Sequence, residues 1–130
     1  MGLTKDYDLA GQVIGLAMKV HRALGPGFLE SVYHAALAHE LSKAGLKVES
    51  ERRIAVQYDG IVIGDFVADL VVNESLIVEL KAVQALAVAH EVQVVNYLTA
   101  TGLDEGLLLN FGTESLQFKK KFRRAKKPLR

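Results

Sequence analysis

The chain has 130 residues, of which half are hydrophobic and 24% are charged, and it contains no cysteine. This length fits one domain with a single core, and the hydrophobic content excludes a disordered chain. The lack of cysteine excludes both a disulfide framework and a thiolate metal site.

Two further signals are missing from the sequence. No apolar run approaches the ~20 residues that a membrane span needs, and the N-terminus has no signal-peptide pattern. We therefore expect a cytoplasmic protein that does not enter the membrane.

Charge is unevenly distributed although the formal net charge is only +1. Residues 119–130 contain eight lysines and arginines and no acid, so residues 1–118 hold the other eight bases against all 15 acids. We divide the chain accordingly into one domain, residues 1–118, and a basic C-terminal tail, residues 119–130. The tail has two interpretations: it contacts nucleic-acid phosphates, or it is a solvated terminus that aids solubility.

Two helices are predicted at the start of the chain. Apolar residues recur at helical spacing over residues 9–24 and stop at Gly25, and a second helix is expected over residues 28–44. Glu30 and Tyr33 are neighbours near the start of this second helix. Taken alone, Glu30 is a structural acid that interacts favourably with the helix macrodipole. His34 and His39 are poorly aligned for metal binding, and we expect both at the surface.

Three strands follow, over residues 47–58, 61–72 and 76–81. Asp59-Gly60 is a strong hairpin signal between the first two strands. In the second and third strands Asp69, Glu79 and Lys81 stand in otherwise apolar sequence, where a charge is costly unless it is paired or bound to metal.

The loop between the second and third strands decides how these three charges are arranged. Glu79 and Lys81 must project from the same face, because side chains alternate along a strand. A three-residue loop at 73–75 would place Asp69 directly opposite Glu79, with facing Cβ atoms roughly 5 Å apart. A two-residue loop would turn Asp69 to the other face.

Such a cluster of charges suits metal chemistry. Two close carboxylates repel each other unless a cation lies between them, and hard oxygen ligands suit Mg²⁺ or Mn²⁺. A lysine two residues further on could hold the attacking water or the charge that develops on a phosphate, which amounts to metal-assisted phosphodiester hydrolysis. The alternative is a charged hairpin in which Lys81 neutralises Asp69 and Glu79, and the hairpin alone does not separate the two.

The end of the chain adds a helix and two strands. A third helix is predicted over residues 90–101, with His90, Gln93 and Tyr97 on one stripe. These polar groups need hydrogen-bond partners, for which there are two alternatives: carbonyl groups of the core, or Lys81 together with a bound phosphate. Residues 106–112 form a short buried strand and residues 115–122 a last one. The predicted order is α-α-β-β-β-α-β-β.

These residues together resemble a known family, the small "GxxExxY" proteins of the PD-(D/E)XK nuclease-like superfamily. The naming motif is Gly27-Phe28-Leu29-Glu30-Ser31-Val32-Tyr33, and the acidic signature corresponds to Asp69 and Glu79-Leu80-Lys81. Gln93-Val94-Val95-Asn96-Tyr97 is similar to the Gln-x-x-x-Tyr helix of the exonuclease-like branch. One departure is Ala68, where the superfamily name expects proline, and this position supplies no ligand.

The resemblance implies a restriction-endonuclease-like α/β core, a central mixed sheet flanked by helices. It implies a divalent ion, Mg²⁺ with Mn²⁺ as the alternative, held by Asp69, Glu79 and the Leu80 carbonyl. Glu30 would reach the same site directly or through water. Lys81 would position the nucleophile, and Gln93 with Tyr97 would orient Lys81 or the substrate backbone.

The function expected from this resemblance is a Mg²⁺-dependent nuclease that hydrolyses DNA with a metal-activated water. The alternative is a non-catalytic module that has kept the nuclease fold and binds nucleic acid or a protein partner. A chain of 130 residues leaves little beyond the catalytic core to bind a substrate. A homodimer, expected by analogy with small dimeric resolvase-like members, would extend that surface.

Overall fold

The computed structural model describes residues 8–123 and confirms the predicted order of helices and strands. In chain order the elements are α1 (Leu9–Leu24), α2 (Glu30–Lys43), β1 (Val48–Tyr58), β2 (Ile61–Val72), β3 (Leu76–Lys81), α3 (Val88–Thr101), β4 (Glu105–Asn110) and β5 (Gln117–Phe122). The observed helices and strands overlap every predicted one, and the largest shifts of a boundary are two residues.

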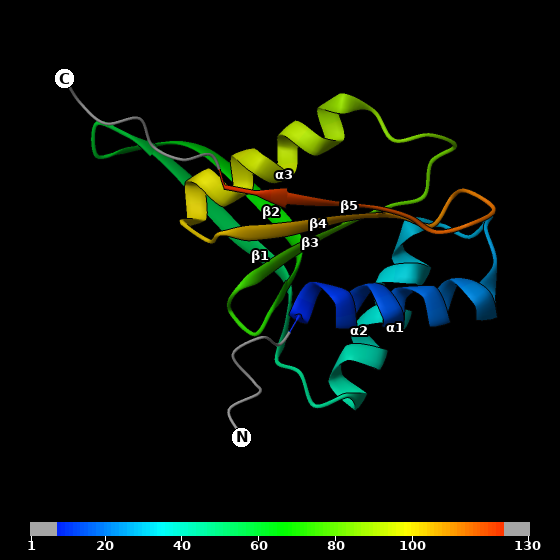
Figure 1. Cartoon of the computed structure of the whole chain (residues 1–130). Coiled ribbons are helices and arrows are strands. Elements are labelled where there is room, and N and C mark those ends of the chain that lie inside the picture. The colour runs from blue at the N-terminus through cyan, green and yellow to red at the C-terminus, as the bar shows by residue number, and fades with distance from the viewer. Residues whose placement is uncertain (1–7, 124–130) are drawn as a thin grey trace.

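The strands form one mixed sheet in the order β1-β2-β3-β4-β5. Neighbouring strands are antiparallel except β3 and β4, which are parallel because α3 crosses over between them. Helices α1 and α2 cover one face of the sheet and α3 covers the other (Figure 1). The expected α/β architecture, a mixed sheet flanked by helices, is confirmed.

Alternating apolar residues of the central strands fill two cores, one on each face. Leu70, Val78 and Leu80 pack with α1 and α2, whereas Ile77 and Leu108 pack with Val94 and Leu98 of α3 and its neighbours. Strand β3 is buried almost along its whole length because both of its faces are covered. A charged side chain on this strand is therefore held in an apolar environment.

The turn between β2 and β3 has the length that the metal-site interpretation requires. Val72 pairs with Leu76, so residues 73–75 form a three-residue loop. Asn73 and Glu74 adopt left-handed backbone conformations, with φ of 52° and 55°. The Asn73 side chain secures the turn by accepting a hydrogen bond from the amide of Lys47 at 2.9 Å.

The basic segment begins inside the sheet and not after it. Lys119, Lys120 and Lys121 belong to β5, which pairs with β4, while residues 124–130 of the predicted tail lie outside the described residues. Lys121 and Lys119 both approach Glu91 of α3, and Arg123 pairs with Asp104 at 2.8 Å. These cations contribute to the packing of β5 against its neighbours.

No helix within residues 8–123 is both long enough and apolar enough to span a membrane.

Candidate functional site

Asp69 and Glu79 meet where the backbone pairing of β2 and β3 stops. Backbone pairing between the two strands extends from the pair Val72 and Leu76 to the pair Leu70 and Val78. At the next position, that of Asp69 and Glu79, hydrogen bonds to side chains take the place of the backbone pairing. The amide of Asp69 donates to Glu79 Oε2 at 2.7 Å, and the amide of Leu80 donates to Asp69 Oδ2 at 2.8 Å. The structure thus brings the two acids together across the hairpin, as the three-residue loop predicts.

Asp69 also lies where β2 passes from one helix layer to the other. Leu70 packs in the core under α1 and α2, whereas Ala68 packs in the core under α3, although residues two apart in a regular strand share a face. In β1, the residue opposite Asp69 is Glu51, which has a φ of 55° and drops out of the pairing. Because both strands change face here, groups from both helix layers can reach Asp69.

Glu30 comes from the first layer, and the residues around it fix its position. It is the first residue of α2. Buried Tyr33 donates a hydrogen bond to the carbonyl of Gly25 at 2.5 Å and accepts one from the amide of Phe28 at 3.1 Å. Gly27, between Gly25 and Phe28, has a backbone φ of 115°, which residues other than glycine rarely adopt. The Gly-x-x-Glu-x-x-Tyr spacing therefore closes a loop that holds Glu30 at the start of the helix.

The ring of Tyr33 is itself held by the core. It stacks on Phe111, with ring centroids 4.7 Å apart and planes inclined by 14°. Phe111 directly follows β4 and is fully buried. The position of Glu30 is thus tied to the centre of the sheet through an aromatic pair.

Burial acts on all three acids of this carboxylate cluster, Glu30, Asp69 and Glu79, and the charge of Asp69 acts on the other two. Burial, and next the charge of Asp69, raise the pKa of Glu79 to about 8. Burial also raises the pKa of Asp69, against the hydrogen bond from Leu80, which lowers it. Glu30 keeps much of its side chain in solvent, yet partial burial and then Asp69 raise its pKa as well. Ionising the cluster is costly without a cation.

Lys81 lies near this cluster without neutralising it. It is half-buried at the end of β3, and its charge opposes the rise in pKa that burial causes at Glu79 and Asp69. Among residues 8–123, however, Lys81 forms no ion pair with any carboxylate. This arrangement does not fit the alternative in which Lys81 merely neutralises Asp69 and Glu79.

An asparagine secures the backbone next to Lys81. The Lys81 carbonyl accepts a hydrogen bond from the amide of Phe111 at 2.8 Å. Asn110, fully buried, accepts from the amide of Val83 and donates to the carbonyl of Val83, both at 3.0 Å. It also accepts from the amide of Gly112 at 3.0 Å. Sequence reasoning missed Asn110, whose signal was a single amide at the end of an apolar strand.

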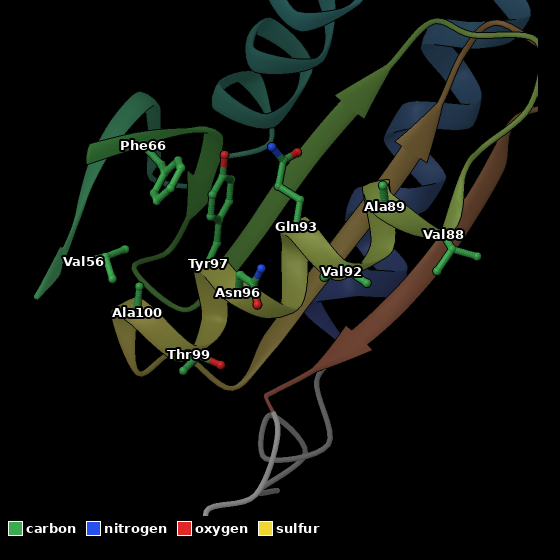
Figure 2. Close-up of a pocket in the computed structure, with 10 residues that line it drawn as sticks. All are labelled: Val56, Phe66, Val88, Ala89, Val92, Gln93, Asn96, Tyr97, Thr99 and Ala100. Carbon is green, nitrogen blue, oxygen red and sulfur yellow. The ribbon is translucent and has the colours of Figure 1, made fainter. Parts of the chain in front are cut away.

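From the second layer, α3 brings Tyr97 close to the acids. Tyr97 is buried, and burial followed by the charges of Glu79 and Asp69 raises the pKa of its hydroxyl. Figure 2 shows Gln93 and Tyr97 projecting from α3 in the same direction. No hydrogen bond joins Gln93 to Lys81 in the part of the chain that the structure describes. The structure thus brings Tyr97 to the carboxylates and places Gln93 one helical turn from it.

His34 is a second residue that sequence reasoning missed. The expected surface position of His34 is consistent with its partial exposure, and its Nε2 lies 3.4 Å from Ser50 Oγ. Burial raises the pKa of Asp69 and of Glu30, and the charge of His34 opposes that rise at both acids. Its spacing of four residues from Glu30 on one helix face was the signal that could have identified it.

The donor chemistry of the cluster fits a hard divalent cation in part. Asp69 and Glu79 each use one carboxylate oxygen to accept a backbone hydrogen bond, which leaves the other oxygen for a ligand. Across residues 8–123, no three His, Asp or Glu side chains converge closely enough to hold a metal ion by themselves. The pair Asp69 and Glu79 is therefore the centre of a candidate site, and further donors must complete it.

Comparisons with known proteins agree with this fold. A family model described as PD-(D/E)XK nuclease superfamily matches residues 7–125. The crystal structure of a protein named SSO0001 is similar, with a TM-score of 0.57 and 17% identity, over 74% of this chain and 50% of that chain. The present chain thus spans about half the length of that protein, and the likeness concerns the fold alone. No curated protein matches the sequence.

Proposed function

The chain belongs to the PD-(D/E)XK nuclease superfamily, and from this membership and the carboxylate cluster we propose that it is a metal-dependent nuclease acting on DNA. The observation that carries the proposal is the pairing of Asp69 with Glu79 across the splayed hairpin. Buried Glu79 and half-buried Asp69 stay next to each other with raised pKa values, which is the condition that a bound divalent cation relieves.

In this proposal Asp69, Glu79 and the Leu80 carbonyl hold Mg²⁺ or Mn²⁺, and Glu30 adds a ligand directly or through water. A divalent ion bound there would supply Lewis-acid stabilisation of the phosphodiester and would make a bound water more acidic. Its charge would also favour the ionised form of all three acids, including Glu79, whose pKa of about 8 otherwise keeps it protonated at neutral pH.

The remaining side chains act on the water and the phosphate. Lys81, half-buried and without an ion pair in the described chain, is available to orient the attacking water and to stabilise charge on the phosphate. Tyr97 and Gln93 are available to hydrogen-bond Lys81 or the substrate backbone. His34 lies close enough to Glu30 and Asp69 for its charge to act on both, and in this proposal it is a further donor toward phosphate.

A second candidate function is a nucleic-acid-binding or protein-binding module that keeps the fold without catalysis. The observation in its favour is that no three acidic or histidine side chains within residues 8–123 converge on one point. Lys81 weighs against it, because a protein that only binds has no need for a half-buried cation that forms no ion pair within residues 8–123 and lies beside buried Glu79 and half-buried Asp69.

Cleavage of labelled single-stranded, duplex and branched DNA with Mg²⁺ or Mn²⁺ tests the proposal. We expect Asp69→Asn and Glu79→Gln each to reduce the rate on the order of 100-fold or more. Asp65→Asn is the matched control, since Asp65 lies on the same strand but pairs with Arg53 at the surface at 2.8 Å. Calorimetry on Asp69→Ala and Glu79→Ala should show that binding of the ion is lost as well. A wild type that binds no divalent ion, with or without DNA, would leave the binding module as the function.

A further inference from the structure

An apolar groove lies directly beside the carboxylate cluster. It has a volume of about 680 Å³, within the range of small-ligand sites, and runs between α3 and the β1–β2 hairpin (Figure 2). Tyr97 lines the groove, and it also packs in the core under α3 with Ala68, the residue before Asp69. A ligand held at the acids can therefore extend along Tyr97 into the groove.

Phe66 presents an aromatic ring to this groove. It pairs with Ile54 of β1, which packs in the core under α3, so the strand pairing places Phe66 on the α3 face of the sheet. Its ring lies against Gly64, where an added Cβ would come within 3.0 Å of Cε2, and its centroid is 5.9 Å from that of the Tyr97 ring. The ring is thus held in position, yet Phe66 stays 45% exposed.

Charge and polarity restrict the ligand that this groove can accept. None of the described residues that line it is charged, so a phosphate inside it would lose hydration without gaining a cation. Phe66 and the exposed Val92 offer apolar contact, whereas the side-chain amides of Gln93 and Asn96 offer hydrogen-bond donors and acceptors. A nucleobase matches both properties, because it has a flat face that stacks on aromatic rings and edges that carry donors and acceptors.

We propose that the groove binds an unpaired nucleobase of a single DNA strand whose neighbouring phosphodiester lies at the carboxylate cluster. This inference rests on the proposed nuclease function and specifies its substrate. The base stacks on Phe66 and meets Gln93 and Asn96 with its edge, while the phosphates stay outside the groove, toward Lys81. Bases in a duplex are already paired and stacked, so their extrusion costs free energy that a single strand does not spend. Single-stranded DNA is therefore the preferred substrate.

The proposal is tested by the binding of labelled single-stranded and duplex DNA of one sequence, in a chelator so that no strand is cut. We expect single strands to bind more tightly than duplex, and Phe66→Leu to weaken single-strand binding about fivefold or more, as the loss of a stacked base predicts. Phe118→Leu is the matched control. Phe118 is 43% exposed but pairs with Leu109, which packs under α1 and α2 on the other face of the sheet. Equal affinities for single strands and duplex, or an unchanged affinity in Phe66→Leu, would overturn the proposal.

A fluorescent base locates the contact on the wild-type protein, without relying on the fold of a variant. 2-Aminopurine is placed at successive positions of the single strand, and its fluorescence is recorded on binding in the chelator. We expect the emission to change most at the nucleotide next to the bond that is cut once Mg²⁺ is added, because that base leaves its neighbours and stacks on Phe66. An equal change at every position would count against the groove, since no single base would then be held there.

Failure of this inference and failure of the nuclease function give different results. Single-strand binding that depends on Phe66, without cleavage of any DNA, would contradict the nuclease and leave the base-binding groove in place. Cleavage of single strands that Asp69→Asn abolishes and Phe66→Leu leaves unchanged would contradict the groove and leave the nuclease in place.

Discussion

The amide of Asp69 donates a hydrogen bond to the carboxylate of Glu79 at 2.7 Å, so a backbone group of one strand is bound by the acidic side chain of the next. The strands thereby stay joined at the point where their backbones separate. This bond favours the charged form of Glu79, whereas burial and the charge of Asp69 disfavour it more strongly. Stability, ion binding and pH are consequently linked at this one pair of acids.

Without divalent ions, the free energy of unfolding should fall as the pH rises from about 4.5 to about 8. The pKa of Glu79 is about 8 in the folded chain, whereas its ordinary value, which applies to the unfolded chain, is 4.5. Between these two pH values the folded chain therefore binds a proton that the unfolded chain has released. The stabilisation is complete below pH 4.5 and lost above pH 8. We expect the melting temperature in a chelator to be about 5 °C or more lower at pH 8.5 than at pH 5.

Glu79→Gln provides the control for this pH dependence, because it cannot ionise and should flatten the curve. Raised pKa values at Asp69 and Glu30 act in the same direction as that of Glu79. Glu40 and Glu91, whose pKa values are lowered by hydrogen bonds from lysines, change charge below pH 4.5 and do not contribute in the window. A wild-type melting temperature that rises between pH 5 and pH 8.5 would contradict the prediction.

Divalent ions should reverse the loss of stability at high pH. At pH 8, an ion that binds only the folded chain adds about 2.7 kcal/mol when present at 100 times its dissociation constant. We expect Mg²⁺ or Mn²⁺ to raise the melting temperature of the wild type and of Asp65→Asn, and to leave that of Asp69→Asn unchanged. An equal rise in all three proteins would place the ion elsewhere on the chain.

Tyr33→Phe should destabilise the chain and disturb Glu30. The substitution leaves the carbonyl of Gly25 and the amide of Phe28 without their buried partner, which costs about 1–3 kcal/mol. Tyr58→Phe is the control, since Tyr58 is exposed and its substitution should change stability by less than about 0.5 kcal/mol. Chemical denaturation measures both. Equal stabilities of the two variants would show that the hydroxyl of Tyr33 does not hold the loop.

Local sequence rules predicted the elements, and they made the pairing of the two acids depend on the length of the loop between β2 and β3. Gly25, Gly45 and Gly102 mark the ends of helices because each has a positive φ, which glycine adopts readily and which does not continue a helix. The three-residue loop at 73–75 set the register that brings Asp69 to Glu79, because register follows from loop length.

Contacts between distant elements were beyond such rules. The change of face at Asp69 depends on a left-handed Glu51 in another strand, and no local pattern marks that residue. His34 joins the site only because α2 packs next to β1. The lysines of β5 have the composition of a tail, but their pairing with β4 and with Glu91 makes them part of the sheet.

Asn110→Ala should lower the free energy of unfolding by more than the substitution of an exposed polar residue does. The change removes the partner of the Val83 amide, the Val83 carbonyl and the Gly112 amide in a fully buried position. We expect a loss of about 3 kcal/mol, since each unsatisfied buried group costs about 1–3 kcal/mol. Asn96→Ala, at an exposed position of α3, should have little effect. Faster hydrogen exchange at Val83 in the variant would connect the loss to the segment after Lys81.

Deleting residues 124–130 should separate the basic terminus from the sheet. A truncation after Phe118 would remove most of β5 and unfold that edge of the sheet. A chain that ends at Arg123 keeps β5 and keeps the ion pair between Arg123 and Asp104. The deleted segment carries Arg124, Lys126, Lys127 and Arg130. If all four contact phosphates, the slope of log affinity for duplex DNA against log salt should flatten by about 3 to 4, at roughly 0.9 per contact. Lys121→Gln should change the slope less, because Glu91 already holds Lys121 at 3.0 Å. An unchanged slope after the deletion would assign DNA binding to the folded domain alone.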